Sequence, residues 1–444
     1  MRTPTPLLAS MSAPGERQSL AVVHGRGARL TLEDGRETID AGSLSSCLLG
    51  HCHPELVRAV QDAAATVYAG DGVRLPAREA AARDMLELAF AGEDWADQIV
   101  FTVSSSEAAD LGLLLAQLLT GRQPLVARES GYHGGVGLAR EVSLHRLWGA
   151  TLASPDGGVL ERPPLVETRV LPLPGCGRGE AEPGHDCRAA CLRSAGAALD
   201  GAAAVILDCS QGAVVPSPGY QEALAEAAAA AGALTIADET VTALGRMGRS
   251  FAFQRATARP DLVTMGKGIT GGAAPAGALI LSRRVVDEIG GRRWMTSSTF
   301  RGHPLAVAAI SATLRVIARD GLVERAARLG EGLERALLAL PGRHPSVRSV
   351  YGEGLMWFVR LHEPVGELGE DVWGGDGSAT PLARVVSDAI LERGVVIREF
   401  SGEMLWLVPP LVIEERELEL AVEALDEALG VADAHLAHAR GGAS

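Results

Sequence analysis

Lysine is nearly absent from this chain of 444 residues. Lys267 is its single lysine, although lysine and arginine together number 41, so arginine supplies every other basic position. Arginine stays protonated at neutral pH, whereas a deprotonated lysine amine can attack a carbonyl carbon. If any side chain of this protein forms an imine with an aldehyde, that side chain is Lys267.

Long apolar runs and an excess of positive charge are also missing. Runs such as 227–233 are too short to span a bilayer, and the N-terminus lacks the basic stretch and hydrophobic core of a signal peptide. The net charge of −14 argues against nucleic acid or anionic lipid as a partner, because both require a basic face. We therefore expect a cytoplasmic protein that binds small molecules, and neither nucleic acid nor a membrane.

Cysteine is scarce as well, with six residues scattered along the chain. This number is too small for a disulfide framework, so we expect reduced thiols. Cys176, Cys187 and Cys191, with His185 between them, could supply four zinc ligands. Their spacing matches no common zinc motif and the segment is rich in glycine, so we predict a plain loop and no metal site.

What the chain does contain is an alternation of short β-rich runs with runs rich in alanine and leucine, from about residue 56 to residue 281. This alternation is typical of an α/β fold with a large, mostly parallel sheet covered by helices on both faces. The expected strands are 98–103, 203–208, 233–238, 261–265 and 276–281, and the expected helices are 107–119, 220–231 and 304–319.

The two ends of the chain predict a smaller α+β domain. Residues after 320 show helices and strands in mixed order, and residues 28–39 predict a hairpin across the tight turn at Asp34-Gly35. The expected domains are an N-terminal segment that packs with the small domain, a large ligand-binding domain and a C-terminal small domain, over residues 1–55, 56–319 and 320–444.

Hydroxyl groups follow the first predicted strand, where Ser105 and Ser106 open a helix. Ligands of doubly wound sheets bind beyond the carboxyl ends of the strands. The backbone N–H groups of a helix N-terminus hold a phosphate there without a basic cluster. A serine cap with Glu107 in the first turn explains the same residues equally well.

An acid and the single lysine end two other predicted strands. A carboxylate such as Asp238 beside a pyridine nitrogen keeps that nitrogen protonated and makes the ring an electron sink, although a surface ion pair is the commoner use of such an acid. Glycines on both sides of Lys267 let a planar cofactor approach the backbone. Tyr132 offers an aromatic face to such a ring, and Thr299 offers a hydroxyl to a phosphate, while core packing and an ordinary turn are the alternatives.

Taken in order, these segments resemble the class III aminotransferases across nearly the whole chain. The matching segments are 34–36 with Asp40, 49–54, 104–108, 131–134, 216–220, 238–239 with 245–246, 265–268, 302–306 and 408–411. The resemblance implies fold type I, a homodimer, and pyridoxal 5′-phosphate (PLP) bound between the large and small domains near the subunit interface.

Residue by residue, the resemblance implies that Lys267 carries PLP as a Schiff base and moves the proton during catalysis. It implies that Asp238 pairs with the ring nitrogen and that Tyr132 stacks on the ring. Ser105 and Ser106 would hold the phosphate. Thr299 would reach the phosphate of the neighbouring subunit.

Three departures from the family pattern point to a specialised substrate. Val241 stands where a glutamine normally bonds the 3-hydroxyl of the cofactor, and valine can neither donate nor accept a hydrogen bond. Trp406 stands where an arginine normally binds the α-carboxylate of the substrate, a role that Arg398 or Arg301 could take over. The loop after Asp208 is also irregular.

The leading hypothesis is an aminotransferase that moves an amino group from an amine or amino-acid donor to a ketone or aldehyde acceptor, in natural-product biosynthesis. The alternative is a PLP enzyme that uses the same carbanion for decarboxylation, elimination, aminomutase chemistry or carbon–carbon bond formation. Lys267 and Asp238 argue against a third reading, a non-catalytic binding protein.

Overall fold

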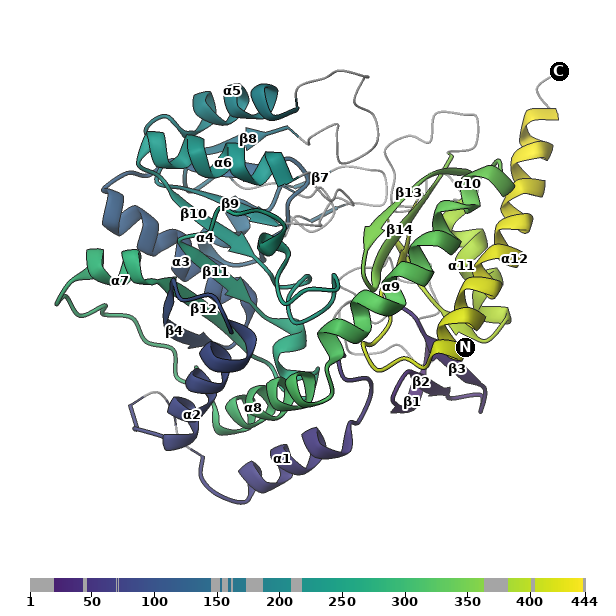
Figure 1. Ribbon diagram of the computed structural model, residues 1–444, viewed down its shortest axis with the longest axis horizontal. Coiled ribbons are helices and arrows are strands. Elements are labelled where there is room, and N and C mark those ends of the chain that lie inside the picture. Colours follow the sequence, from purple (N-terminus) through teal and green to yellow (C-terminus); the bar gives the residue numbers. More distant parts are fainter. Residues whose placement is uncertain are drawn as a thin grey trace.

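The structure is a computed structural model that describes residues 20–42, 46–68, 70, 72–144, 152–153, 159–160, 163–172, 187–208, 218–362, 382–400 and 404–441. Two parts lie side by side, with helices α8 and α9 leading from one to the other (Figure 1). None of the helices in these ranges is long and apolar enough to cross a membrane. Of the proposed zinc ligands, Cys176 and His185 lie outside the described residues.

The larger part is built on a seven-stranded sheet that is parallel except for β12, which runs antiparallel to both of its neighbours. Its strands, in spatial order, are β4 (Ala96–Thr102), β12 (Gly277–Ser282), β11 (Leu262–Met265), β10 (Leu234–Asp238), β9 (Ala204–Asp208), β5 (Leu125–Arg128) and β8 (Thr168–Leu171). The five strands expected from the sequence are all present, within about two residues of their predicted ends.

Helices cover both faces of this sheet because both faces of its strands are apolar. In β9, Val205 packs with the cluster beneath α5 (Cys187–Leu199) and α6 (Pro218–Ala231), whereas Ile206 packs with the cluster beneath α3 (Ser105–Thr120). Such continuous apolar runs are typical of strands that are buried on both sides. The predicted α/β class, with helices on both faces, is therefore confirmed.

Further helices surround this sheet and connect it to the smaller part. They are α1 (Pro54–Ala64), α2 (Pro76–Asp84), the π-helical turn Met85–Ala89, α4 (Gly137–Glu141), the 3₁₀ turns η3 (Ala252–Arg255) and η4 (Lys267–Thr270), α7 (Arg283–Ile289) and α8 (Pro304–Arg319). Two short strands, β6 (Leu152–Ala153) and β7 (Val159–Leu160), pair with each other. Helix α8 begins at Pro304. The first N–H groups of a helix have no acceptor within it, so a proline there costs no hydrogen bond.

The smaller part contains two four-stranded sheets. One has the order β1 (Val22–Arg26), β2 (Arg29–Leu32), β3 (Glu37–Asp40) and β15 (Val395–Val396), and the other has the order β13 (Val347–Glu353), β14 (Met356–Leu361), β17 (Met404–Leu407) and β16 (Arg398–Phe400). Its helices are α9 (Leu322–Leu338), α10 (Leu340–Arg343), α11 (Leu382–Glu392) and α12 (Glu415–Gly441).

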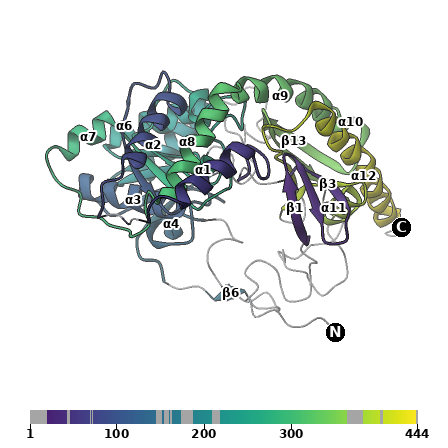
Figure 2. The same ribbon diagram turned by 90° about the horizontal axis from the view of Figure 1, so that it is seen from below.

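The N-terminal strands join this smaller part. The predicted hairpin is present as β2 and β3, and β3 pairs in parallel with β15 from the other end of the chain. Figure 2 shows β1 and β3 beside β13 and α11, away from the larger sheet. This pairing supports the proposal that residues 1–55 pack with the small domain.

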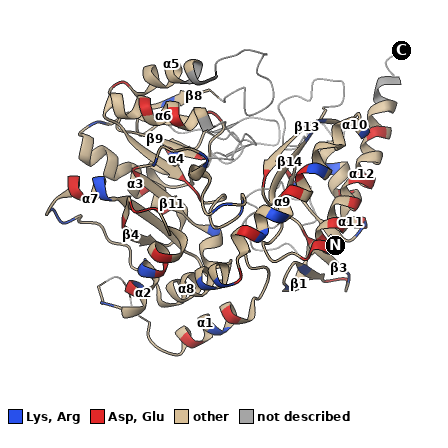
Figure 3. Ribbon diagram, viewed as in Figure 1, with Lys and Arg blue, Asp and Glu red and all other residues tan. Residues whose placement is uncertain are grey.

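Charged residues lie mainly on the outer helices. Acidic and basic positions alternate along α9, whereas the central strands β9, β10 and β11 carry few of either sign (Figure 3). A charged group inside the larger sheet is therefore unusual. The buried ones, Arg128, Asp208 and Asp238, each end a strand.

Candidate active site

Five of the residues singled out by the sequence, Val241 among them, line one pocket at the carboxyl ends of the parallel strands. The pocket spans about 300 Å³ of empty space, open solvent included, and its lining consists of Ser105, Tyr132, His133, Asp208, Asp238, Thr240, Val241 and Lys267. Strands β9 and β10 end at their aspartates, and β11 ends two residues before the lysine. Parallel strands bring their carboxyl ends to one edge, which explains how distant segments meet here.

Lys267 opens the turn η4 in a conformation that a side chain seldom adopts, with φ of 43°. Such strain is typical of functional sites, where the surroundings hold the residue in place. Burial lowers the pKa of its amine; the charge of Asp238 opposes this shift, and the charge of Arg398 adds to it. A lowered pKa increases the neutral fraction of the amine, which is the form that attacks an aldehyde.

Gly266 brings the lysine loop against the start of helix α3. A Cβ atom at Gly266 would lie 2.6 Å from the Cβ of Ser105, a distance that real Cβ contacts do not show. Glycine is therefore required for this close approach. The contact places the lysine beside the helix N-terminus.

Asp238 is buried at the end of β10 and accepts two hydrogen bonds. His133 Nδ1 lies 2.8 Å from its Oδ2, and the backbone N–H of Thr240 donates to its Oδ1 over 3.1 Å. Burial acts to raise the pKa of this carboxyl, but the hydrogen bond and charge of His133 and the bonds from Thr240 outweigh it and lower the pKa overall. The pocket therefore holds an ionised carboxylate deep in the protein.

In the serine segment, one side chain caps a helix and another lines the pocket. Ser104 caps α3, since its Oγ accepts from the N–H of Glu107 over 3.2 Å, and the Glu107 carboxylate accepts from Val103 N over 2.7 Å. Ser105 lines the pocket at the first turn, where backbone N–H groups are open to an anion. Ser106 lies against Gly134, where an added Cβ would come within 2.4 Å of its Oγ.

Tyr132 is half-buried at the mouth of the pocket. Burial raises the pKa of its phenol, and the negative charge of Asp238 raises it further. The phenol therefore stays neutral, and its ring lies within electrostatic reach of the carboxylate.

Thr299 is not among the residues that line the pocket. It is exposed on the segment between α7 and α8, and its carbonyl oxygen lies against Gly70, where an added Cβ would meet it at 2.9 Å. Within one chain, the structure does not bring this hydroxyl into the site.

The side of the pocket toward the small domain is an apolar wall, formed partly by a sheet of that domain. Val241 lines the pocket and belongs to one buried cluster with Trp406 and Phe358. The rings of Phe358 and Trp406 meet edge to face at 5.0 Å. Arg398 pairs directly with Trp406 across β16 and β17, so both side chains leave the same face of this sheet.

Sequence reasoning missed three polar residues of the pocket: His133, Asp208 and Thr240. The position of Asp208 carried a usable signal, because β9 and β10 are neighbouring parallel strands and Asp208 pairs in register with Asp238. The contact between His133 and Asp238 carried none, since 105 residues separate the two in the sequence.

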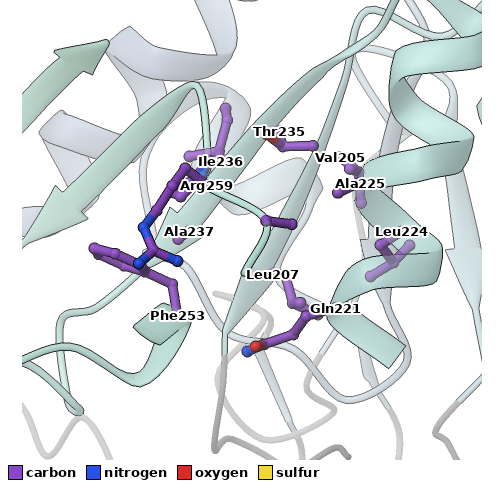
Figure 4. Close-up of a pocket in the computed structure, with 12 residues that line it drawn as sticks. Val205, Leu207, Gln221, Leu224, Ala225, Thr235, Ile236, Ala237, Phe253 and Arg259 are labelled. Atoms are coloured by element: carbon purple, nitrogen blue, oxygen red, sulfur yellow. The ribbon is translucent and has the colours of Figure 1, made fainter. Parts of the chain in front are cut away.

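A second hollow lies between α6 and strands β9 and β10 (Figure 4). Its lining is mostly apolar, with Leu207, Leu224 and Phe253 among its residues. Its one basic group, Arg259, is held by Glu93 at 2.6 Å and lies over the ring of Phe253. The chemistry therefore belongs to the first pocket, where the reactive groups converge.

The groups in the first pocket fit PLP. A lysine amine with a lowered pKa suits the aldehyde, an ionised aspartate suits the ring nitrogen, and a helix N-terminus suits the phosphate. One buried polar atom of a lining residue, Thr240 Oγ1, finds no hydrogen-bond partner among the described residues. A polar ligand is therefore consistent with the lining.

Comparison with known proteins gives the same result. The family model described as "Aminotransferase class-III" matches residues 11–429. The chain is 33% identical to the acetylornithine aminotransferase of Mycobacterium tuberculosis, over 93% of each chain, and 33% identical to that of Streptomyces coelicolor, over 95% of this chain and 94% of the relative.

Solved structures match over nearly the full length. An S-selective transaminase from Arthrobacter sp. superposes with a TM-score of 0.89 at 27% identity, covering 97% of this chain and 96% of the other. A phospholyase from Arthrobacter in complex with phosphoethanolamine superposes with a TM-score of 0.80, also at 27% identity, covering 94% and 96%. The chain therefore belongs to the class III aminotransferases, which are PLP-dependent enzymes of fold type I.

Proposed function

We propose that this chain transfers an amino group from an amino-acid donor to a ketone or aldehyde that has no carboxylate beside its carbonyl. PLP supplies the electron sink when it is bound. When PLP is bound, Lys267 Nζ would hold its aldehyde, Asp238 would pair with its ring nitrogen, Tyr132 would stack on the ring, and Ser105 and Ser106 would hold the phosphate. The amine of Lys267, once free, would move the proton from the substrate carbon to the cofactor carbon that had carried the aldehyde.

The single observation that carries the proposed substrate class is the position of Trp406. This residue is 3% exposed and packs in one cluster with Val241, which itself lines the cofactor pocket. A carboxylate placed against this wall would lose its hydration without gaining a partner. An apolar group placed there would instead gain contact with Trp406 and Phe358.

Arg398 offers a carboxylate a different place on the same sheet face. It pairs with Trp406 across the strands, and its charge acts on the amine of Lys267. A guanidinium at this position suits the carboxylate of a small amino-acid donor. Among the structural relatives, the Arthrobacter transaminase was also solved with alanine bound, so alanine is the donor to try first.

The test is a spectral titration of the PLP-loaded enzyme with alanine and with simple apolar amines, one at a time. We expect alanine to convert the bound cofactor to pyridoxamine phosphate and release pyruvate, and an apolar ketone or aldehyde to reverse that change. Reversal by 2-oxo acids alone, with no response to any ketone or aldehyde, would overturn the proposed substrate class.

Elimination or decarboxylation is the competing outcome of the same titration. The structural match to a phospholyase supports keeping a lyase reaction as an alternative. Ammonia or carbon dioxide released without pyridoxamine phosphate would replace transamination with one of these reactions. An amine such as phosphoethanolamine belongs in the panel for this reason.

A homodimer is the second part of the proposal. Val67, Tyr68, Met295 and Phe300 are exposed, with Met295 at 85% and Tyr68 at 74%. The contact between Gly70 and Thr299 brings these two segments together, so the apolar groups form a surface that suits a second copy of the chain. Thr299 would then reach the phosphate bound by the partner.

Sedimentation and cofactor affinity test this arrangement. We expect a dimer, and we expect Thr299→Ala to weaken PLP binding without changing the oligomeric state. The control is Val73→Ala, because Val73 is exposed like Thr299 but has no hydroxyl to lose. A monomer that binds PLP tightly would contradict the proposal.

A further inference from the structure

The carboxyl ends of β5, β9 and β10 place a row of buried charged groups behind the cofactor pocket. Arg128 ends β5, Asp208 ends β9 and Asp238 ends β10, and these strands are neighbours in the sheet. Arg128 is 0% exposed, and both aspartates are almost fully buried. Buried charges cost free energy unless they are paired, so the pairing within this row decides its effect.

His133 connects the two aspartates. Its Nδ1 lies 2.8 Å from Asp238 Oδ2, and its Nε2 lies 3.9 Å from Asp208 Oδ2. The second distance is longer than a hydrogen bond, and a movement of about 1 Å would close it. At Gly131, an added Cβ would lie 3.1 Å from His133 Nε2 and 3.3 Å from Asp208 Oδ2, so the missing side chain leaves the space between the two groups open.

The ends of the row are fixed by further bonds. Arg128 Nη2 donates to Asp208 Oδ1. The Oγ of Ser143 accepts from the backbone N–H groups of His133 and Gly134, over 2.9 Å and 3.1 Å. The imidazole is therefore held in place by its own loop, and Asp208 is held in place by the guanidinium.

The charges of this row favour one arrangement. The ionised Asp238 requires a proton on His133 Nδ1, because two lone pairs would otherwise face each other at 2.8 Å. The carboxylate of Asp208 lies on the other side of the same imidazole, so it helps to orient the ring toward Asp238. Arg128 offsets the charge of Asp208, so Asp238 keeps its negative charge for a cation in the pocket.

We propose that Asp208, oriented by Arg128, is a positioning residue that acts through His133 to hold Asp238 against the ring nitrogen of PLP. This proposal rests on the function proposed above, in which Asp238 binds that nitrogen. It adds a chain of three residues behind the aspartate, none of which touches the ring nitrogen itself. Removing a member should therefore weaken the hold on the nitrogen without removing the carboxylate.

The test measures the dissociation constant of PLP for four proteins: wild type, Asp208→Asn, His133→Asn and the double variant. Asparagine at position 133 keeps a hydrogen-bond donor for Asp238 but has no second ring nitrogen facing Asp208. We expect Asp208→Asn to weaken PLP binding about three- to tenfold in the wild-type background. In the His133→Asn background we expect no further loss, because the connection is already broken.

A cofactor analogue separates this role from a general loss of structure. The same four proteins are loaded with pyridoxal phosphate in which carbon replaces the ring nitrogen. We expect the effect of Asp208→Asn to vanish with this analogue, since the row acts on a nitrogen that is no longer there. The matched control is Thr264→Val, which removes a buried hydroxyl from the β11 residue in register with Asp238 and should bind both cofactors as wild type does.

The outcomes are distinguishable. The positioning role would be overturned if Asp208→Asn lowered the affinity for PLP and for the analogue equally. It would also be overturned if Asp208→Asn lowered PLP affinity equally with histidine and with asparagine at position 133. If wild type binds the analogue as tightly as PLP, then Asp238 does not bind the nitrogen, and the proposed function of Asp238 fails instead. A pH titration of the visible absorption band of the loaded proteins provides a second readout that a merely structural role would leave unchanged.

Discussion

The two walls of the cofactor pocket are built differently. The wall formed by the ends of the larger sheet is polar and charged. It contains Lys267, and Asp238 bonded to His133 and to the backbone N–H of Thr240. The wall toward the small domain is apolar, with Val241 packed in one cluster with Trp406. In the proposed function, the first wall holds the cofactor and the second selects the substrate.

The difference also lies in how the walls are made. Each reactive group of the first wall follows the carboxyl end of a strand, so the register of one sheet fixes their spacing. The second wall combines β14 and β17 of the small domain with the segment after β10 of the large domain. The apolar wall therefore depends on how the two domains meet, whereas most of the polar wall comes from the larger sheet alone.

Replacing Lys267 tests the polar wall with the largest expected effect. Lys267→Ala should remove the visible absorption band of the bound cofactor and lower kcat by roughly 10⁴-fold or more. Lys267→Arg is the control that keeps the charge, and it should fail equally, because arginine does not form the imine. Substantial transamination by either variant would show that the polar wall is not where catalysis occurs.

Removing the charge of Asp238 comes next. Asp238→Asn keeps the shape and one hydrogen-bond acceptor but removes the carboxylate, so we expect kcat/KM to fall by about 100-fold or more. The fall should appear in kcat more than in KM. A loss confined to KM would assign Asp238 to substrate binding rather than to the cofactor ring.

Converting the apolar wall sharpens the comparison. Trp406→Arg should raise the preference for acceptors with a carboxylate beside the carbonyl by about tenfold to 100-fold relative to apolar ketones. The control, Trp406→Phe, keeps the wall apolar and should keep the original preference. An unchanged preference in Trp406→Arg would mean that this wall does not select the substrate.

Arg398 lies near both walls, and the effect of its charge on Lys267 is the smallest of the four expected effects. Its positive charge favours the neutral form of Lys267, so Arg398→Gln should raise the pKa of that amine. The rate of PLP uptake by the cofactor-free protein should then rise with pH over a higher range than in wild type. Stopped-flow absorbance across pH measures this, and a shift to lower pH would contradict the assigned geometry.

Sequence determined much of the first wall. The single lysine, the acid at the end of the 234–238 strand and the hydroxyls at the start of α3 were recognisable because strand ends and helix starts follow from local patterns. Parallel strands then place such ends together by necessity. The strand positions and the α/β class were predicted for the same reason.

Tertiary structure decided the rest. The contact of His133 with Asp238 joins segments that are 105 residues apart, and no local pattern encodes it. Trp406 was recognised as a departure, but only the paired strands show that Arg398 shares its face of the sheet. Local periodicity fixes which residues end an element, whereas packing between elements fixes which of those residues meet. Periodicity therefore revealed Lys267 and Asp238, and only packing revealed their neighbours and the apolar wall.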